Sequence, residues 1–282
     1  MRFQLDLTKE YGIVLEGGGA RGSYQIGAWK ALREAGIKIR GIAGASVGAL
    51  NGALICMDDL EKAEEIWENI RYSQVINVDD DVIETVKKLD LKSLDLVKVA
   101  EDAKRILKDK GLDITPLKNL IESVVDEDKI RSSDRELYLT TYSVTDRELL
   151  VLNAKDIPDG EIGDMLLASA YFPAFRNDKL GGKRYLDGGG WNNVPINILL
   201  EHDYKDILVI RIYGLGYDSE RTTEIPEDVH VTHIAPRQDL GGILEFDRTR
   251  ARKNMTLGYY DAKRVLYGLE GRWYYLYAPE SD

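Results

Sequence analysis

The sequence predicts an α/β fold, with a mostly parallel central sheet and helices on both of its faces. Within the first 57 residues, a short apolar stretch, a glycine-rich turn and a stretch of helical periodicity follow one another twice. This alternation is typical of parallel strands joined by crossover helices. Of the 282 residues, 44% are hydrophobic, enough for one sizeable core, so we expect a single domain over residues 1–282.

The two strand–helix units at the start of the chain share one pattern. Strands are expected at 11–16 and 37–43, and the apolar residues of 23–35 recur at helical spacing between them. Gly36 suits the left-handed position that often follows a helix. The second strand leads into an apolar helix that is expected to end near Met57.

A charged block at about 58–134 interrupts the alternation. It has no clear strand pattern, and its apolar residues form helical stripes, including one over about 82–109. We expect a helical cap or insertion there. Helices that simply cover the sheet are the alternative, and the sequence leaves both open.

The rest of the chain resumes the alternation of strands and helices. A short strand is expected to end at Asp187, and the tail at 273–277 is aromatic. Further strands are expected at 137–145, 149–152, 206–213 and 229–234, and helices at 161–170, from near Pro195 and over about 245–267.

Composition argues against several classes of protein. The net charge of −11 disfavours binding to nucleic acids and to anionic membranes. The chain has neither an apolar leader nor an uninterrupted apolar run of membrane-spanning length, so a cytoplasmic location is expected. Cys56 is the single cysteine, which rules out an internal disulfide, and its apolar surroundings predict a buried, inert thiol.

The second glycine-rich turn has the form G-x-S-x-G, between a predicted strand and an apolar helix. This is the context of a nucleophile elbow, so Ser46 is the candidate nucleophile. The helix N-terminus would favour negative charge that develops nearby. The other positions of the elbow are Gly44, Ala45, Val47 and Gly48. A tight turn in a glycine-rich protein is the alternative.

The first glycine-rich turn is a candidate oxyanion hole. Its small residues leave backbone N–H groups uncovered at the start of a helix, where they can hold a negatively charged oxygen. The positions concerned are Gly17, Gly18, Gly19, Ala20, Arg21 and Gly22. Arg21 could add positive charge there, or it could be a structural or solvated cation.

The same turn also fits a dinucleotide-binding fingerprint. Gly17, Gly19 and Gly22 satisfy G-x-G-x-x-G, and Arg40 on the next strand could suit a 2′-phosphate. An NADP-dependent oxidoreductase is therefore an alternative. A cofactor site, however, has no need for the glycine-flanked Ser46.

A serine hydroxyl needs a base, and the sequence offers two kinds. His202, His230 and His233 would complete a Ser…Asp…His order, but they fall at a helix end or within a strand pattern. Asp187 ends a short strand and opens a glycine turn, and functional groups gather at the C-terminal ends of parallel strands. Burial beside Ser46 would raise its pKa and make it a feasible base. A turn-capping role is the alternative for Asp187.

Three motifs in one order resemble the patatin-like phospholipase family: GGGARG at 17–22, GASVG at 44–48 and DGG at 187–189. The likeness extends beyond them, and the least typical part lies at about 58–110. Residues 17–54 look like the family's N-terminal block, and residues 168–176 look like its proline-containing segment. Residues 187–195 look like its Asp-Gly-Gly segment, and residues 240–262 look like its C-terminal helix.

The resemblance implies a patatin-like three-layer α/β/α fold and hydrolysis of ester bonds in phospholipids or lysophospholipids. Carried over by position, Ser46 is the nucleophile and Asp187 the base of a catalytic dyad, with the glycine loop at 17–22 as oxyanion hole. No metal and no cofactor are implied. A non-catalytic lipid-binding module is a further alternative, which the intact Ser46 and Asp187 disfavour.

The expected partner is a lipid or acyl-ester substrate. Peripheral membrane contact through the amphipathic block at 58–126 or the aromatic tail is a further hypothesis, and ordinary core or oligomer packing is its alternative. The sequence leaves the oligomeric state open.

Overall fold

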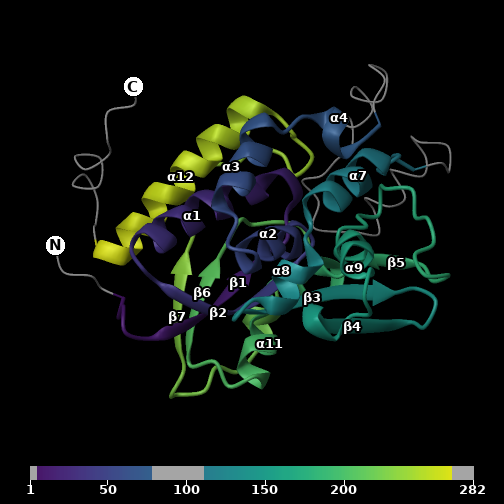
Figure 1. Ribbon diagram of the computed structural model, residues 1–282. Helices are drawn as coiled ribbons and strands as arrows, with labels where there is room; N and C mark the ends of the chain where they lie inside the picture. The colour runs from purple at the N-terminus through teal and green to yellow at the C-terminus, as the bar shows by residue number, and fades with distance from the viewer. Residues whose placement is uncertain (1–4, 78–110, 269–282) are drawn as a thin grey trace.

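A single sheet organises the molecule. The computed structural model describes residues 5–77 and 111–268, and within them seven strands pair in the order β4-β3-β2-β1-β6-β7, with β5 on β3 (Figure 1). The parallel strands are β1 (Glu10–Leu15), β2 (Lys38–Ala45), β3 (Glu136–Ser143), β6 (Asp206–Ile210) and β7 (His230–Ile234). Two strands run antiparallel to β3, namely β4 (Glu148–Asn153) and β5 (Tyr185–Asp187). The mostly parallel sheet is therefore confirmed.

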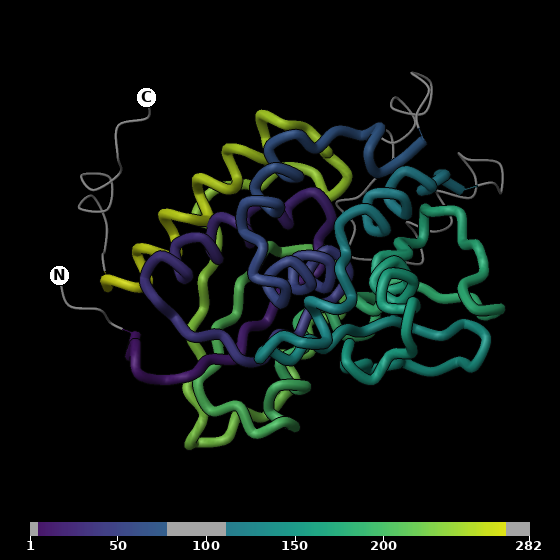
Figure 2. The backbone as a smooth tube through the Cα atoms, in the orientation of Figure 1, coloured from purple at the N-terminus to yellow at the C-terminus, as the bar shows by residue number. Residues whose placement is uncertain are grey.

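The first two strands lie at the centre of the sheet. The later strands add on both sides, β3 next to β2 and β6 next to β1, so that the purple strands near the centre of Figure 2 have a green strand on one side and a teal strand on the other. From their second residue onward, β1 and β2 are almost continuously buried. Burial on both faces explains why their sequences are apolar runs and not alternating patterns.

Helices cover both faces of the sheet unequally, as Figure 1 shows. The thicker layer contains α1 (Ser23–Glu34), α2 (Val47–Cys56), α3 (Leu60–Asn69) and α12 (Arg248–Tyr267), and α11 (Ile196–Glu201) packs on the opposite face. Successive residues of β1 serve the two cores in turn: Ile13 and Leu15 belong to the larger one and Val14 to the smaller one beside α11. Helices on both faces are confirmed.

Helices α1 and α12 touch through their backbones. A Cβ atom on Gly27 of α1 would collide with the carbonyl oxygen of Met255, and one on Gly258 of α12 would collide with that of Tyr24. Two glycines thus let the helices approach more closely than side chains allow. The α12 helix begins at an Asp247 cap and ends at Gly268, whose φ of 59° is left-handed.

The described part of the block at 58–134 is helical, as the sequence predicts. Besides α3 it contains α4 (Tyr72–Val75), α7 (Thr115–Val124) and α8 (Glu127–Ser132), and α7 contacts both α4 and α9 (Ile162–Ser169). The predicted stripe at about 82–109 lies outside the described residues, as does the aromatic tail at 273–277.

One strand is shorter than the sequence predicts. We expected a strand over 206–213, but β6 ends at Ile210. The Arg211 N–H still donates to the Ile234 carbonyl of β7 over 2.9 Å, but the next three backbone N–H groups donate to the buried carboxylate of Glu16. The donors are Ile212 (2.7 Å), Tyr213 (3.0 Å) and Gly214 (3.2 Å).

We expect Gly27→Ala to destabilise the protein, although alanine favours a helix. The added methyl group meets backbone atoms of α12, and overpacking of this kind costs about 1–3 kcal/mol. Gly163→Ala in α9 is the matched control, because its Cβ would lie 3.7 Å from the nearest side chain. Urea unfolding should show a loss of stability for the first variant and no loss for the second. Equal stability of both would contradict the backbone contact.

Candidate active site

Ser46 lies on a strained turn between β2 and α2. Its φ of 54° and ψ of −126° are rarely adopted by a residue with a side chain, at a cost of about 1–3 kcal/mol. Two glycines make the turn sterically feasible. A Cβ on Gly44 would collide with the carbonyl of Gly48, and a Cβ on Gly48 would collide with the carbonyl of Leu15 on β1. The turn therefore has the form that the G-x-S-x-G motif predicts.

The side chain of Ser169 holds this turn from α9. The backbone N–H of Ser46 donates to Ser169 Oγ over 3.0 Å, and Ser169 is fully buried. Sequence reasoning did not single out this residue. The only available signal was its position within the segment 168–176, which resembles part of the patatin-like family.

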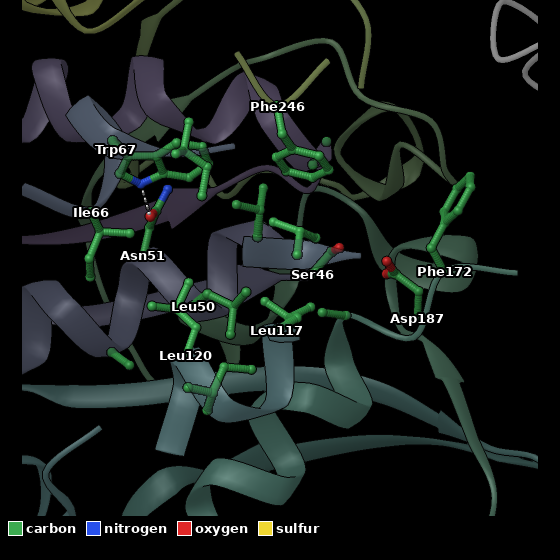
Figure 3. Close-up of a pocket in the computed structure, with 18 of the residues that line it drawn as sticks. Ser46, Leu50, Asn51, Ile66, Trp67, Leu117, Leu120, Phe172, Asp187 and Phe246 are labelled. Atoms are coloured by element: carbon green, nitrogen blue, oxygen red, sulfur yellow. Dashed lines mark hydrogen bonds between the residues drawn. The ribbon is translucent and has the colours of Figure 1, made fainter. Parts of the chain in front are cut away.

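Asp187 reaches the same edge of the sheet by an unexpected route. We expected it at the end of a strand in a parallel sheet, but β5 is antiparallel to β3. The strand β3 continues past Thr140, the partner of Ala45, and β5 pairs with that overhang so that Asp187 lies opposite Thr141. The expected direction of the strand was wrong, while the side chains of Ser46 and Asp187 still lie beside each other (Figure 3).

Burial dominates the electrostatics of Asp187. Loss of solvation raises the pKa of its carboxyl group from 3.8 to about 6. Interaction with the Ser46 side chain and a 2.8 Å hydrogen bond from the Gly189 amide act in the opposite direction. Since these opposing contacts are neutral donors, the carboxyl group keeps a raised pKa and can exchange a proton near neutral pH.

Two residues of the first glycine turn line the same pocket. Gly18 and Gly19 line it together with Ser46. Within the described ranges, their N–H groups donate to no backbone oxygen. Gly19 has a φ of 55°, and a Cβ there would collide with the carbonyl of Ile243. These two amides can therefore receive an anion.

Neighbouring amides of the loop have structural partners. Those of Gly17, Ala20 and Arg21 donate to the carbonyls of Asn193 (3.2 Å), Ile243 (2.8 Å) and Gly18 (3.3 Å). At Gly22 a Cβ would collide with the Val47 side chain, so this position permits close packing on the elbow. Of the six predicted positions, the structure brings Gly18 and Gly19 to the pocket.

Arg21 points away from the pocket and ties two loops together. Its Nε donates to the carbonyl of Gly241 over 2.7 Å, and its Nη1 donates to the carbonyls of Ile212 (3.4 Å) and Tyr213. Of the two roles open from the sequence, the structural one matches this geometry.

Asn193 links the glycine loop to the turn that carries Asp187. Its side-chain Nδ2 donates to the backbone carbonyl of Gly17 over 3.1 Å, and its backbone carbonyl accepts a hydrogen bond from the Gly17 amide. The residue is buried and also lines the pocket. Asn193 falls in the segment 187–195 that resembles the patatin-like family, but nothing in the local sequence indicates a partner 176 residues away.

An apolar pocket of about 1080 Å³, counting the space open to solvent, extends from Ser46. Its walls come from α2, α3, α7 and the loop before α12. The apolar residues that line these walls include Leu50, Leu54, Met57, Ile66, Trp67, Leu117, Leu120, Ile243 and Phe246. The polar Asn51 in this wall is bonded to Trp67 Nε1, Gln25 Oε1 and the Gly22 carbonyl. Such a lining suits an apolar ligand with one reactive polar end.

The three histidines lie outside this pocket. Nδ1 of His202 bonds to the Ile198 carbonyl over 2.8 Å, and Nε2 of His233 bonds to Glu220 over 2.6 Å. His230 is exposed at the start of β7. A histidine-containing triad with Ser46 is therefore not assembled.

The dinucleotide alternative finds no support around Arg40. This residue lies near the start of β2, about 16 Å from the edge that bears the glycine loop. Its guanidinium pairs with Glu10 (2.8 Å) and with Asp134. Arg40 is therefore not placed to hold a 2′-phosphate beside Gly17, Gly19 and Gly22.

The cysteine, possible metal ligands and the length of the helices bear on other functions. Cys56 is buried, as predicted, and burial raises the pKa of its thiol. Across residues 5–77 and 111–268, no cluster of three or more His, Cys, Asp or Glu side chains could hold a metal ion. In the same part of the chain, every helix is too short or too polar to cross a membrane.

We expect Asp187→Asn to stabilise the folded protein at neutral pH but not in acid. Because the folded-state pKa is raised, ionisation of Asp187 opposes folding. This cost is absent below about pH 4, grows as the pH rises through about 6, and then stays constant. A rise to about 6 corresponds to about 3 kcal/mol.

Urea unfolding of wild type and variant at about pH 4 and pH 8 measures this difference. Asp159→Asn is a matched control, because the Asp159 side chain is 98% exposed. If Asp187→Asn increased the free energy of unfolding by the same amount at both pH values, the result would count against a raised pKa of Asp187.

Comparison with known proteins gives matches of very different extent. Over 50 residues the chain is 58% identical to a lysophospholipase of Aspergillus terreus, and this matched segment covers 18% of this chain and 3% of that protein. Over 47 residues it is 57% identical to a neuropathy target esterase of Drosophila sechellia, and this matched segment covers 17% of this chain and 3% of the esterase. The solved structure of VipD from Legionella pneumophila is similar with a TM-score of 0.49 and 16% identity, over 91% of this chain and 66% of VipD.

The lysophospholipase and the esterase are much longer than the segments that they share with this chain, which span 3% of their length. A family model described as patatin-like phospholipase matches far more, residues 13–200. That range contains both glycine turns, Ser46 and Asp187. Because the match extends over more than half of the sequence, the chain belongs to the patatin-like phospholipase family.

Proposed function

We propose that the protein hydrolyses carboxylic ester bonds of lipids, with Ser46 as nucleophile and Asp187 as general base. One observation carries the proposal. The hydroxyl of Ser46, on its strained turn, lies beside a carboxyl group with a pKa of about 6, and both open into an apolar pocket.

In the acylation step, Ser46 Oγ attacks the carbonyl carbon of the ester, and its proton passes to the Asp187 carboxylate. The bond between the carbonyl carbon and the alcohol oxygen then breaks. Asp187 returns the proton to the departing alcohol, which leaves an acyl group on Ser46. A pKa of about 6 suits both transfers, because the carboxyl group is ionised near pH 7 and still accepts a proton readily.

In the deacylation step, water replaces the alcohol. Asp187 takes a proton from the water as its oxygen attacks the acyl carbon, and the bond to Ser46 Oγ breaks. The proton returns to Ser46, and a fatty acid is released.

Negative charge develops on the carbonyl oxygen in both steps. The amides of Gly18 and Gly19 are the proposed donors, supported by the N-terminus of α2. The remaining positions of the loop at 17–22 shape it through their own hydrogen bonds and close contacts.

The names of the relatives support a lipid ester as the substrate class. One is a lysophospholipase and another an esterase, and the family description refers to phospholipases. Phospholipids and lysophospholipids are therefore the proposed substrates. A cytoplasmic location and peripheral membrane contact stay predictions.

We expect Ser46→Ala and Asp187→Asn each to lower kcat for a lipid ester by about 10⁴-fold or more, because each removes a partner in the proton transfer. A fluorophosphonate probe should label the wild type and not Ser46→Ala. The triple variant His202→Ala, His230→Ala, His233→Ala is the control and should keep its activity. Hydrolysis that survives the loss of Ser46, or that disappears with the histidines, would overturn the proposed dyad.

The pH profile tests Asp187 independently. Since the base must be ionised, kcat/KM should fall as the pH drops through about 6 and should level off above about 7. The profile is measured with a neutral ester, so that only groups of the protein titrate. A plateau that continues below pH 5 would require a different base.

A further inference from the structure

The apolar pocket follows one helix over its whole length. Val47, Leu50, Leu54 and Met57 all line it, and their spacing of three or four residues places them on one face of α2. Ser46 precedes this helix, and Met57 is its C-cap residue. At about 1.5 Å per residue, the lining from Ser46 to Met57 extends over about 16 Å.

A second helix faces α2 across the pocket. Leu117, Leu120, Ile121 and Val124 of α7 form an apolar stripe on the pocket side. At the end away from Ser46, the segment that follows α7 contacts α2, because the Asp126 amide donates to Met57 Sδ over 3.4 Å. We refer to this pocket along α2, whose other walls come from α7, α3 and the loop before α12, as the channel.

The site gives this channel a direction. In Figure 3 Asp187 lies on one side of Ser46, and Leu50, Leu120 and Ile66 lie on the other. The departing alcohol must receive its proton from Asp187, so the alcohol part of the substrate belongs on the Asp187 side. The acyl part then extends away from Asp187, along α2.

The length of the channel matches that of a membrane-lipid chain. The hydrocarbon core of a bilayer is about 30 Å thick, so each of its two leaflets is about 15 Å deep. The lining of about 16 Å along α2 is long enough to contact one such chain in extended form.

We propose that α2 measures the acyl chain. The carbonyl carbon lies at Ser46, the chain lies along Leu50 and Leu54, and its methyl end reaches Met57, so that these positions set the preferred chain length. This inference rests on the proposed function. Each further methylene that the channel buries raises kcat/KM by about fourfold, the factor that ~0.8 kcal/mol corresponds to.

The test is a chain-length profile for esters of one alcohol, from acetate through butyrate, octanoate and laurate to palmitate. For the wild type, kcat/KM should rise up to the long chains. Leu50→Trp, Leu54→Trp and Met57→Trp place an indole at about 6, 12 and 16 Å from Ser46 along the helix. The longest ester that each hydrolyses well should increase in that order.

Two further variants keep the test decisive. Leu149→Trp, on the exposed side of β4 where Leu149 is 36% exposed, should leave the wild-type profile unchanged. Leu120→Trp enters the channel from α7 and should also shorten the preferred chain, which covers the case in which a variant of α2 does not fold. Circular dichroism and thermal unfolding identify such a variant.

The outcomes separate this inference from the proposed function. If the tryptophan variants of α2 lost activity toward all esters in equal proportion, the role of α2 in setting the chain length would be overturned. The same holds if the longest ester hydrolysed did not increase from Leu50→Trp through Leu54→Trp to Met57→Trp. Ser46-dependent hydrolysis with no preference for chain length would do the same and leave the proposed function intact. Absence of any Ser46-dependent hydrolysis would instead refute the proposed function.

Discussion

Close approach of backbone segments at one edge of the sheet is the constraint on which the site depends. Gly48 rests against the carbonyl of Leu15, Gly188 against that of Thr140, and Gly17 against the Asn193 side chain. None of these positions has room for a methyl group. Three parts of the chain, distant in sequence, can therefore bring Ser46, the glycine loop and Asp187 together. These glycines matter because the absence of a side chain lets neighbouring segments approach closely.

This arrangement places two unfavourable features side by side. Ser46 has a strained backbone, and Asp187 loses solvation without gaining a cation. Neutral hydrogen bonds from Gly189 to Asp187 and from the Ser46 amide to Ser169 offset part of that cost and leave the chemistry of both side chains available. A lysine or arginine beside Asp187 would stabilise the carboxylate better, but it would also lower the pKa and make Asp187 a weaker base in the role that we propose for it. The local structure thus favours reactivity over stability.

The sequence predicts the parts of the site that local geometry dictates. A strand, a G-x-S-x-G turn and an apolar helix specify the elbow at Ser46, because the motif is itself the local structure. The direction of β5 could not be inferred, since it depends on how far β3 extends beyond β2. Ser169 and Asn193 were missed for a related reason. Their partners are 123 and 176 residues away, and a single sequence contains no signal for such contacts.

The composition of α2 connects the fold to the pocket. Apart from Asn51 the helix has no polar side chain, and a helix that is apolar all round must be covered on every side. The sheet covers one side, where Gly52 lies against Leu137 and Ile42. The opposite side faces the channel, so its apolar residues cannot be explained by packing on the sheet. A ligand with a long apolar part would cover that side. In the function that we propose, the helix therefore has two roles: it positions Ser46 at its first turn, and it contacts the acyl chain along its length.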